Sequence, residues 1–232
     1  PPFALFDPAM GMTTVIPWMD PTRPAKVNPK LLVKTIEKFG VTNVFGSPAL
    51  LNVLGRYTES NGIELPSIKR VISAGAAMPV ATIRRLQWTL SENAEVYTPY
   101  GATECLPVAS VSGSELNDDV EKRTADGEGT CIGRPVAPNA VKIIPVTDSV
   151  IESLDQTIEL PIGITGEIIV HGPTSTDSYW ARTEQTNLAK ITDSENRIWH
   201  RMGDAGYFDG EGRLWYCGRK SQRVVNQDVI MY

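Results

Sequence analysis

Residues 70–97, with the sequence RVISAGAAMPVATIRRLQWTLSENAEVY, contain a strand, a helix and a second strand in succession. The first strand is Arg70 to Ser73, whose apolar centre indicates burial. Pro79 then opens a helix, and Ala94 to Tyr97 supplies the next strand. Strand, helix and strand joined by short links predict a parallel sheet with right-handed crossovers.

The chain before residue 70 shows the same alternation. Asn28-Pro29 begins a helix that Gly40 ends, because proline suits the first helical position and glycine the position after the last. A β-rich run follows at residues 41–45, and Ser47-Pro48 begins another helix. We therefore expect an α/β fold in which residues 1–125 form a parallel-sheet subdomain.

Beyond residue 125 the pattern changes to short strands, with one helix expected at residues 183–189. Asp209-Gly210-Glu211-Gly212 is typical of a hairpin turn, and we identify no internal repeat. Residues 126–220 are expected to form a smaller antiparallel, β-barrel-like subdomain, and residues 221–232 to begin a hinge. The predicted strands are Ala140 to Val146, Glu167 to His171, Ala205 to Phe208 and Leu214 to Cys217.

Composition excludes several classes of protein. The 232 residues carry a net charge of −5 without a Lys/Arg run, so we expect no nucleic-acid partner. No apolar stretch approaches the ~20 residues that a membrane span needs. Three cysteines without metal-ligand spacing favour a reduced, cytoplasmic protein.

The segment Tyr100-Gly101-Ala102-Thr103-Glu104 combines groups that suit one nucleotide. The Tyr100 ring can stack on a base, the Thr103 hydroxyl can bond a phosphate, and Glu104 can hold Mg²⁺. Gly101 allows close approach of the backbone to a ligand. Read singly, Tyr100 is more often a core aromatic and Glu104 a surface or capping carboxylate.

Asp204 after Gly203, and Arg219 after Gly218, offer an acceptor and a donor for the two hydroxyls of a ribose. Asp204 alone equally suits a turn cap, but its expected pairing with Arg219 across a hairpin favours ribose binding.

These motifs resemble the adenylate-forming superfamily of acyl-CoA synthetases, luciferases and peptide-synthetase adenylation domains. The opening residues 1–8 most resemble the bacterial β-lactone synthetases of olefin biosynthesis. Thr98 and Ser221 depart from the residues that many relatives carry. The motifs that carry the resemblance are residues 73–79, 97–104, 133–135, 166–168, 200–204 and 218–219.

The resemblance implies activation of a long-chain, 3-hydroxy fatty acid by ATP and Mg²⁺, followed by β-lactone closure. Thr103 and Glu104 are then catalytic, with Glu104 as the metal ligand. The implied nucleotide-binding residues are Gly75, Ala76, Ala77, Tyr100, Gly101, Ala102, Thr103, Asp204 and Arg219.

Three functions stay open: a β-lactone synthetase, a fatty-acyl-CoA or fatty-acyl-AMP ligase, and a non-catalytic nucleotide-binding module. Association with other enzymes of the pathway is also open. We find neither the family's phosphate loop nor its C-terminal domain with a catalytic lysine, and therefore expect a central piece of a larger enzyme.

Overall fold

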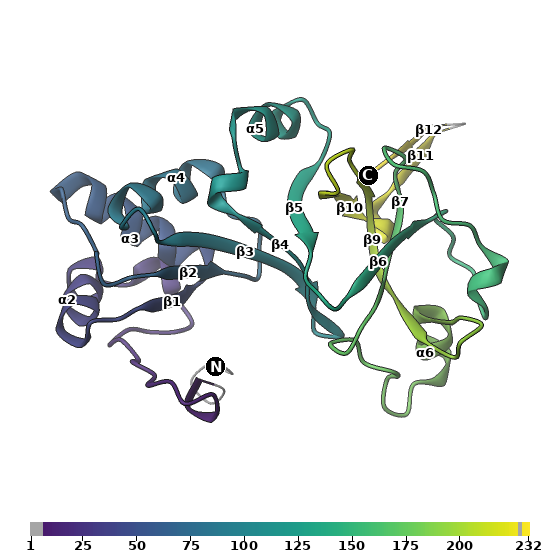
Figure 1. Ribbon diagram of the computed structural model, residues 1–232, viewed down its shortest axis with the longest axis horizontal. Helices are drawn as coiled ribbons and strands as arrows, with labels where there is room; N and C mark the ends of the chain where they lie inside the picture. Colours follow the sequence, from purple (N-terminus) through teal and green to yellow (C-terminus); the bar gives the residue numbers. More distant parts are fainter. Residues whose placement is uncertain (1–6, 227–228) are drawn as a thin grey trace. The chain divides into compact units, whose positions relative to one another are not determined.

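The computed structural model describes residues 7–226 and 229–232, and the chain forms two compact units, Pro1–Thr98 and Pro99–Tyr232 (Figure 1). The units divide at Thr98, whereas the sequence pattern suggested boundaries at residues 125 and 220. Those subdomain limits stay a prediction. Among the described residues, no helix is long and apolar enough to cross a membrane.

The first unit contains the predicted parallel sheet. β1 pairs with β2, and β2 pairs with β3, in parallel register throughout. Val71 on β2 and Val96 on β3 are fully buried and lie opposite each other. The strands are β1 (Asn43–Gly46), β2 (Arg70–Ser73) and β3 (Glu95–Ala102).

The helices predicted to begin at residues 28–29 and 47–48 do so, and the first also ends where the sequence predicts. The Asn28 side chain accepts hydrogen bonds from the first-turn backbone, and Gly40 ends the helix at φ 56°. Ser47 caps the next helix by accepting from Leu50 N. These helices are η1 (Pro24–Lys26), α2 (Pro29–Phe39), α3 (Pro48–Asn61) and α4 (Val80–Thr89).

The second unit contains an antiparallel sheet in the order β4-β5-β10-β9-β7-β6, with β8 paired to β9. A separate hairpin is made by β11 and β12. This confirms the predicted change from parallel to antiparallel pairing. The strands are β4 (Cys105–Ser112), β5 (Thr130–Pro135), β6 (Ala140–Ile144), β7 (Gly166–His171), β8 (Lys190–Thr192), β9 (Ile198–Phe208), β10 (Leu214–Arg219), β11 (Val224–Asn226) and β12 (Val229–Met231).

Short helices connect these strands. Asn117 caps α5 by accepting from Val120 N, and α6 lies where the sequence predicts a helix. They are η2 (Gly113–Glu115), α5 (Asp118–Ala125), η3 (Leu154–Gln156), α6 (Thr183–Ala189) and η4 (Lys220–Gln222).

The two turns that flank β9 share a sequence pattern. The sequence DSENRIW at residues 193–199 joins β8 to β9, and DGEGRLW at residues 209–215 joins β9 to β10. In both, Oδ1 of the leading Asp accepts two backbone N–H bonds. Oδ2 of the same Asp accepts from the side chains of the Arg and the Trp that follow it in the turn, which are Arg197 and Trp199 in the first turn and Arg213 and Trp215 in the second. The two turns therefore hold both ends of β9 in the same way.

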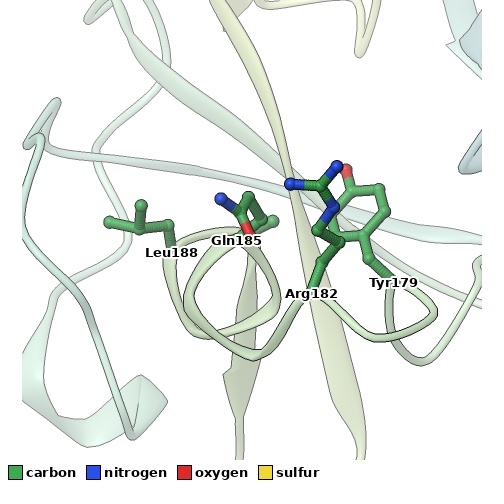
Figure 2. Close-up of a pocket in the computed structure, with 5 residues that line it drawn as sticks. Tyr179, Arg182, Gln185 and Leu188 are labelled. Atoms are coloured by element: carbon green, nitrogen blue, oxygen red, sulfur yellow. The ribbon is translucent and has the colours of Figure 1, made fainter.

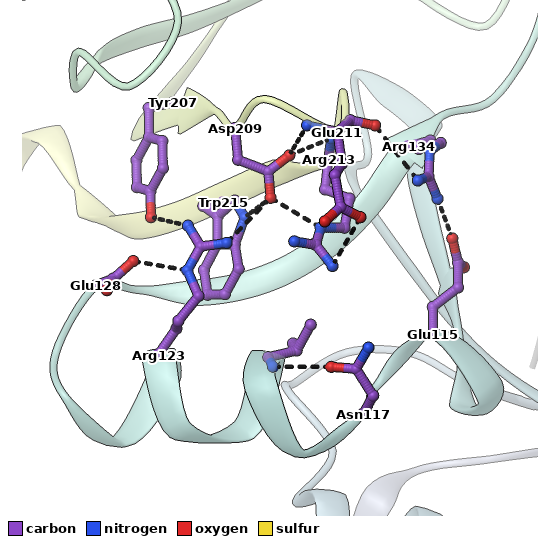
Figure 3. Close-up of polar contacts among 11 residues, drawn as sticks. Glu115, Asn117, Arg123, Glu128, Arg134, Tyr207, Asp209, Glu211, Arg213 and Trp215 are labelled. Carbon is purple, nitrogen blue, oxygen red and sulfur yellow. Dashed lines mark hydrogen bonds and ion pairs between the residues drawn. The ribbon is translucent and has the colours of Figure 1, made fainter.

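The second turn has an additional partner in α5. Arg123 donates to Asp209 Oδ2 at 3.3 Å and lies over the Trp215 ring, 4.1 Å from its centre (Figure 3). The Tyr207 ring stacks on the Trp215 ring, with the two ring centres 6.1 Å apart. This network ties α5 to the β9–β10 hairpin.

Candidate functional site

Asp204 and Arg219 are directly opposite each other in the β9–β10 hairpin, as the sequence predicts. The register of β9 shifts next to Gly203, which has a φ of 68°, and a second shift occurs in β10 between Tyr216 and Gly218. Such bulges re-aim neighbouring side chains. Arg219 Nη1 lies 3.0 Å from Asp204 Oδ1.

Tyr100 joins this pair, so the structure brings three of the predicted nucleotide-binding residues together. Its phenol donates a 2.5 Å hydrogen bond to Asp204 Oδ2. Tyr216, which the sequence analysis missed, lies beside it with ring centres 6.2 Å apart. The available signal was an aromatic residue shortly before Gly218-Arg219.

The Asp204 carboxylate is buried, with 3% of its surface exposed. Burial raises its pKa above the ordinary value, and the Tyr100 bond and Arg219 charge only partly oppose this effect. Oδ1 has the ion pair with Arg219 but accepts no hydrogen bond from any residue that the structure describes. A buried acceptor of this kind suits a ligand hydroxyl.

Tyr100, Gly101 and Ala102 lie within β3, so their expected position after the end of a strand is wrong. β3 and β4 are hydrogen-bonded neighbours, and Thr103-Glu104 forms the turn between them. A Cβ at Gly101 would lie 2.6 Å from the backbone oxygen of Cys105. The hairpin itself therefore requires Gly101, independently of any ligand.

Glu104 is held by a neighbouring segment. Tyr179 donates to Glu104 Oε1 at 2.9 Å, and Thr176 N donates to the Glu104 backbone oxygen at 2.8 Å. Burial acts to raise the pKa of Glu104, but the Tyr179 bond, a backbone hydrogen bond and the charge of Lys190 hold it below its ordinary value.

Two basic residues near Glu104, His200 and Lys190, are themselves buried. Burial and the Lys190 charge lower the pKa of His200 to about 4, so this imidazole is neutral at pH 7. Burial also lowers the pKa of Lys190. Neither residue was predicted as a site residue, because each becomes a neighbour of Glu104 only through β8 and β9.

Gly75, Ala76 and Ala77 follow β2 directly, as predicted, in an exposed bend of the first compact unit. Gly75 has a φ of 94°, and a Cβ there would meet no atom within 4 Å. The Ser73 hydroxyl just before them is buried without a hydrogen-bond partner in the described chain. Their role in binding a base stays a prediction.

Glu104 fits a Mg²⁺–nucleotide complex by the chemistry of its donor. No group of three His, Cys, Asp or Glu side chains gathers in residues 7–226 and 229–232. Mg²⁺ is commonly held by one or two carboxylates together with substrate phosphates, and a single carboxylate suffices for that arrangement.

The Tyr179 ring also lines a cavity of about 310 Å³ on the α6 side (Figure 2). Its other walls are Arg182, Gln185, Leu188 and Ala189. The ring thus lies between an open hollow and the Glu104 carboxylate.

Known proteins resemble this chain closely. It is 54% identical to an olefin beta-lactone synthetase of Stenotrophomonas maltophilia and 50% identical to one of Xanthomonas campestris pv. campestris. Each match covers 100% of this chain and 42% of the relative, so the chain spans less than half of their length.

A solved structure agrees with the fold. The long-chain-fatty-acid-CoA ligase of Archaeoglobus fulgidus matches with a TM-score of 0.63 and 26% identity, over 83% of this chain and 37% of that one. A family model described as AMP-binding enzyme matches residues 6–180. The chain therefore belongs to the AMP-binding family of adenylate-forming enzymes.

Proposed function

We propose that the protein containing this chain activates a long-chain 3-hydroxy fatty acid with ATP and closes the acyl-adenylate to a β-lactone. The observation that carries the proposal is the cluster of Tyr100, Asp204 and Arg219, which presents a ring, a buried acceptor and a cation to one ligand. The similarity to olefin beta-lactone synthetases supports this choice of product. The chain matches 42% of those relatives, so activity is proposed for the whole protein.

In the first step a substrate carboxylate oxygen attacks the α-phosphorus of ATP, and pyrophosphate leaves. The Tyr100 ring stacks on the base, while Asp204 and Arg219 hold the ribose hydroxyls. The Thr103 hydroxyl orients the α-phosphate from the exposed turn. Mg²⁺ bound at Glu104 would neutralise phosphate charge. Holding both anionic reactants in line is the main contribution of these residues.

In the second step the 3-hydroxyl oxygen of the same acyl chain attacks the acyl carbon, and AMP leaves. Intramolecular attack needs a folded acyl chain and exclusion of water, and requires no second substrate. We also propose a cytoplasmic location, because all three cysteines are free thiols.

The second candidate is a fatty-acyl-CoA ligase, which the likeness to the Archaeoglobus fulgidus enzyme favours. A non-catalytic nucleotide-binding module is disfavoured, because such a module has no need of a carboxylate placed for Mg²⁺ at Glu104.

The deciding experiment supplies full-length protein with ATP, Mg²⁺ and a long-chain 3-hydroxy acid, with and without CoA. A β-lactone identified by NMR in both reactions supports the proposal. A thioester formed only with CoA favours the ligase, and the absence of pyrophosphate release in both reactions favours the binding module.

A further inference from the structure

Residues 172–179, here called the strap, run alongside residues 104–107 and are bonded to them at several points. Thr174 donates to Asn139 Oδ1 at 3.1 Å, and Asn139 Nδ2 donates to the Pro107 oxygen at 2.6 Å. Ser175 and Cys105 form an antiparallel bridge. These contacts place the strap against the start of β4.

The end of the strap is bonded to Glu104 itself. Thr176 N donates to the Glu104 backbone oxygen at 2.8 Å, and the Tyr179 phenol donates to Glu104 Oε1 at 2.9 Å. Buried Lys190 reinforces this end, because its ammonium donates to the Thr176 backbone oxygen and to Thr176 Oγ1. Both the backbone and the side chain of Glu104 are therefore held by the same segment.

Tyr179 is fixed independently of Glu104. Its backbone N–H donates to Thr186 Oγ1 at 3.0 Å, which attaches the strap to α6. Its ring lines the cavity with Arg182 and Leu188 (Figure 2). The backbone of Tyr179 is thus attached to α6, while its phenol donates to Glu104.

We propose that Tyr179 is a positioning residue that orients the Glu104 carboxylate for Mg²⁺. The proposal rests on the proposed function, in which Glu104 is the metal ligand. Tyr179 was not among the predicted site residues.

The physical reason is the freedom of a Glu side chain at an exposed turn. An ionised carboxylate has about four lone-pair sites, and one of them is used by the phenol. The remaining sites are then presented in one orientation, which avoids the entropy cost of ordering the side chain when the cation binds. Partners that orient a metal ligand commonly change metal affinity or activity by about 10- to 100-fold when removed.

The test is Tyr179→Phe in full-length protein, with pyrophosphate release measured over a Mg²⁺ titration. We expect the Mg²⁺ midpoint to rise about tenfold, while the affinity for AMP without Mg²⁺ stays within twofold of wild type. The matched control is Tyr207→Phe, which removes a phenol that accepts a hydrogen bond from Arg123 and has no contact with Glu104. The control should leave the Mg²⁺ midpoint unchanged.

Two further variants separate positioning from folding. In a Glu104→Gln background, Tyr179→Phe should add no further change in the midpoint, whereas an equal additional loss would show a merely structural role and overturn the proposal. If Tyr179→Phe lowers the melting temperature strongly, Thr186→Ala takes its place, since it loosens the Tyr179 backbone and keeps the phenol. It should raise the midpoint in the same direction.

The outcomes also separate this inference from the proposed function. A wild-type midpoint in Tyr179→Phe, with a raised midpoint in Glu104→Gln, overturns the inference alone. A wild-type midpoint in both variants removes Glu104 as the metal ligand and overturns the inference, while the proposed function is decided separately by the β-lactone product.

Discussion

The phenol of Tyr100 donates a 2.5 Å hydrogen bond to Oδ2 of Asp204, and 104 positions separate the two residues in the chain. Arg219 contacts the other carboxylate oxygen at 3.0 Å. The Asp204 carboxylate is therefore oriented from both sides, and we propose that a ribose hydroxyl binds to it. Substitution of single residues in this cluster can therefore measure what each side chain contributes to nucleotide binding.

Asp204→Ala should weaken AMP binding by about 1.5–3 kcal/mol, because a charge-assisted acceptor for the ribose is lost. Isothermal calorimetry on the folded variant measures the change. AMP affinity within twofold of wild type would remove Asp204 from the site. Asp193→Ala, in the turn before β9, is a control that should leave the affinity unchanged.

Adenosine binding should weaken as the pH falls. The loss should occur at a higher pH than it would if Asp204 had the pKa of an ordinary aspartate. The pKa of Asp204 is raised by burial above its model-compound value of 3.8, and the ionised form is the acceptor. Binding is therefore lost as pH falls through the raised pKa. Adenosine titrations by calorimetry across the acid range test this, with Asp204→Asn as the variant that should lack the transition.

The same group has the opposite effect on stability. Because its folded-state pKa is raised, Asp204 contributes stability below pH 3.8, and the contribution is lost as pH rises through the folded-state pKa. Asp204→Asn should remove this dependence in chemical denaturation curves. An unchanged pH profile in the variant would contradict the assignment of the raised pKa.

Glu104→Gln should reduce adenylation sharply and leave AMP binding almost unchanged. The substitution keeps the shape but removes the charge that a hard cation requires, and AMP has no β- or γ-phosphate to bridge through a metal. Pyrophosphate release by full-length protein over a Mg²⁺ titration provides the measurement. A wild-type rate with a wild-type Mg²⁺ midpoint would show that Glu104 is not the metal ligand.

Asp209→Asn should destabilise the protein by about 2 kcal/mol through its charged hydrogen bonds, and more than Asp193→Asn. The two turns have the same bonds, but Asp209 also accepts from Arg123, which covers Trp215 (Figure 3). Urea denaturation of both variants measures the order. Equal losses would show that the Arg123 contact contributes nothing to stability.

Glu167→Gln should destabilise the protein by about 3–5 kcal/mol, because it leaves Arg201 buried without a charged partner. Glu167 is fully buried, with Arg201 at 2.7 Å and Lys220 at 2.9 Å. Lys220→Met is the matched control and should cost less, since the Arg201–Glu167 pair remains. Thermal denaturation compares the two variants, and the reverse order would contradict this account.

Local signals were sufficient for much of the fold. Asn28 and Ser47 cap their helices as predicted, because a short polar side chain before a helix satisfies backbone N–H groups wherever it occurs. The turn at Asp209 was predictable from its residues, but the hairpin alone did not fix the pairing of Asp204 with Arg219, because the register of β10 shifts between Tyr216 and Gly218.

Local signals failed where strand ends depend on a partner. β3 continues through Tyr100 to Ala102 because β4 pairs with it, and no feature of residues 98–102 alone indicates that pairing. The shared structure of the turns at Asp193 and Asp209 was also not predicted, because it depends on side-chain bonds to Arg and Trp that a short polar turn does not reveal.

The sequence by itself determined the class of fold, the alternating helices and strands of residues 28–97 and the family, because each depends on residues close together in the chain. Only the tertiary structure decided that Tyr100 orients Asp204, that Tyr179 holds Glu104 and that Glu167 pairs with Arg201. These contacts join positions far apart in the sequence. Their geometry depends on the packing of whole strands, which no local pattern specifies.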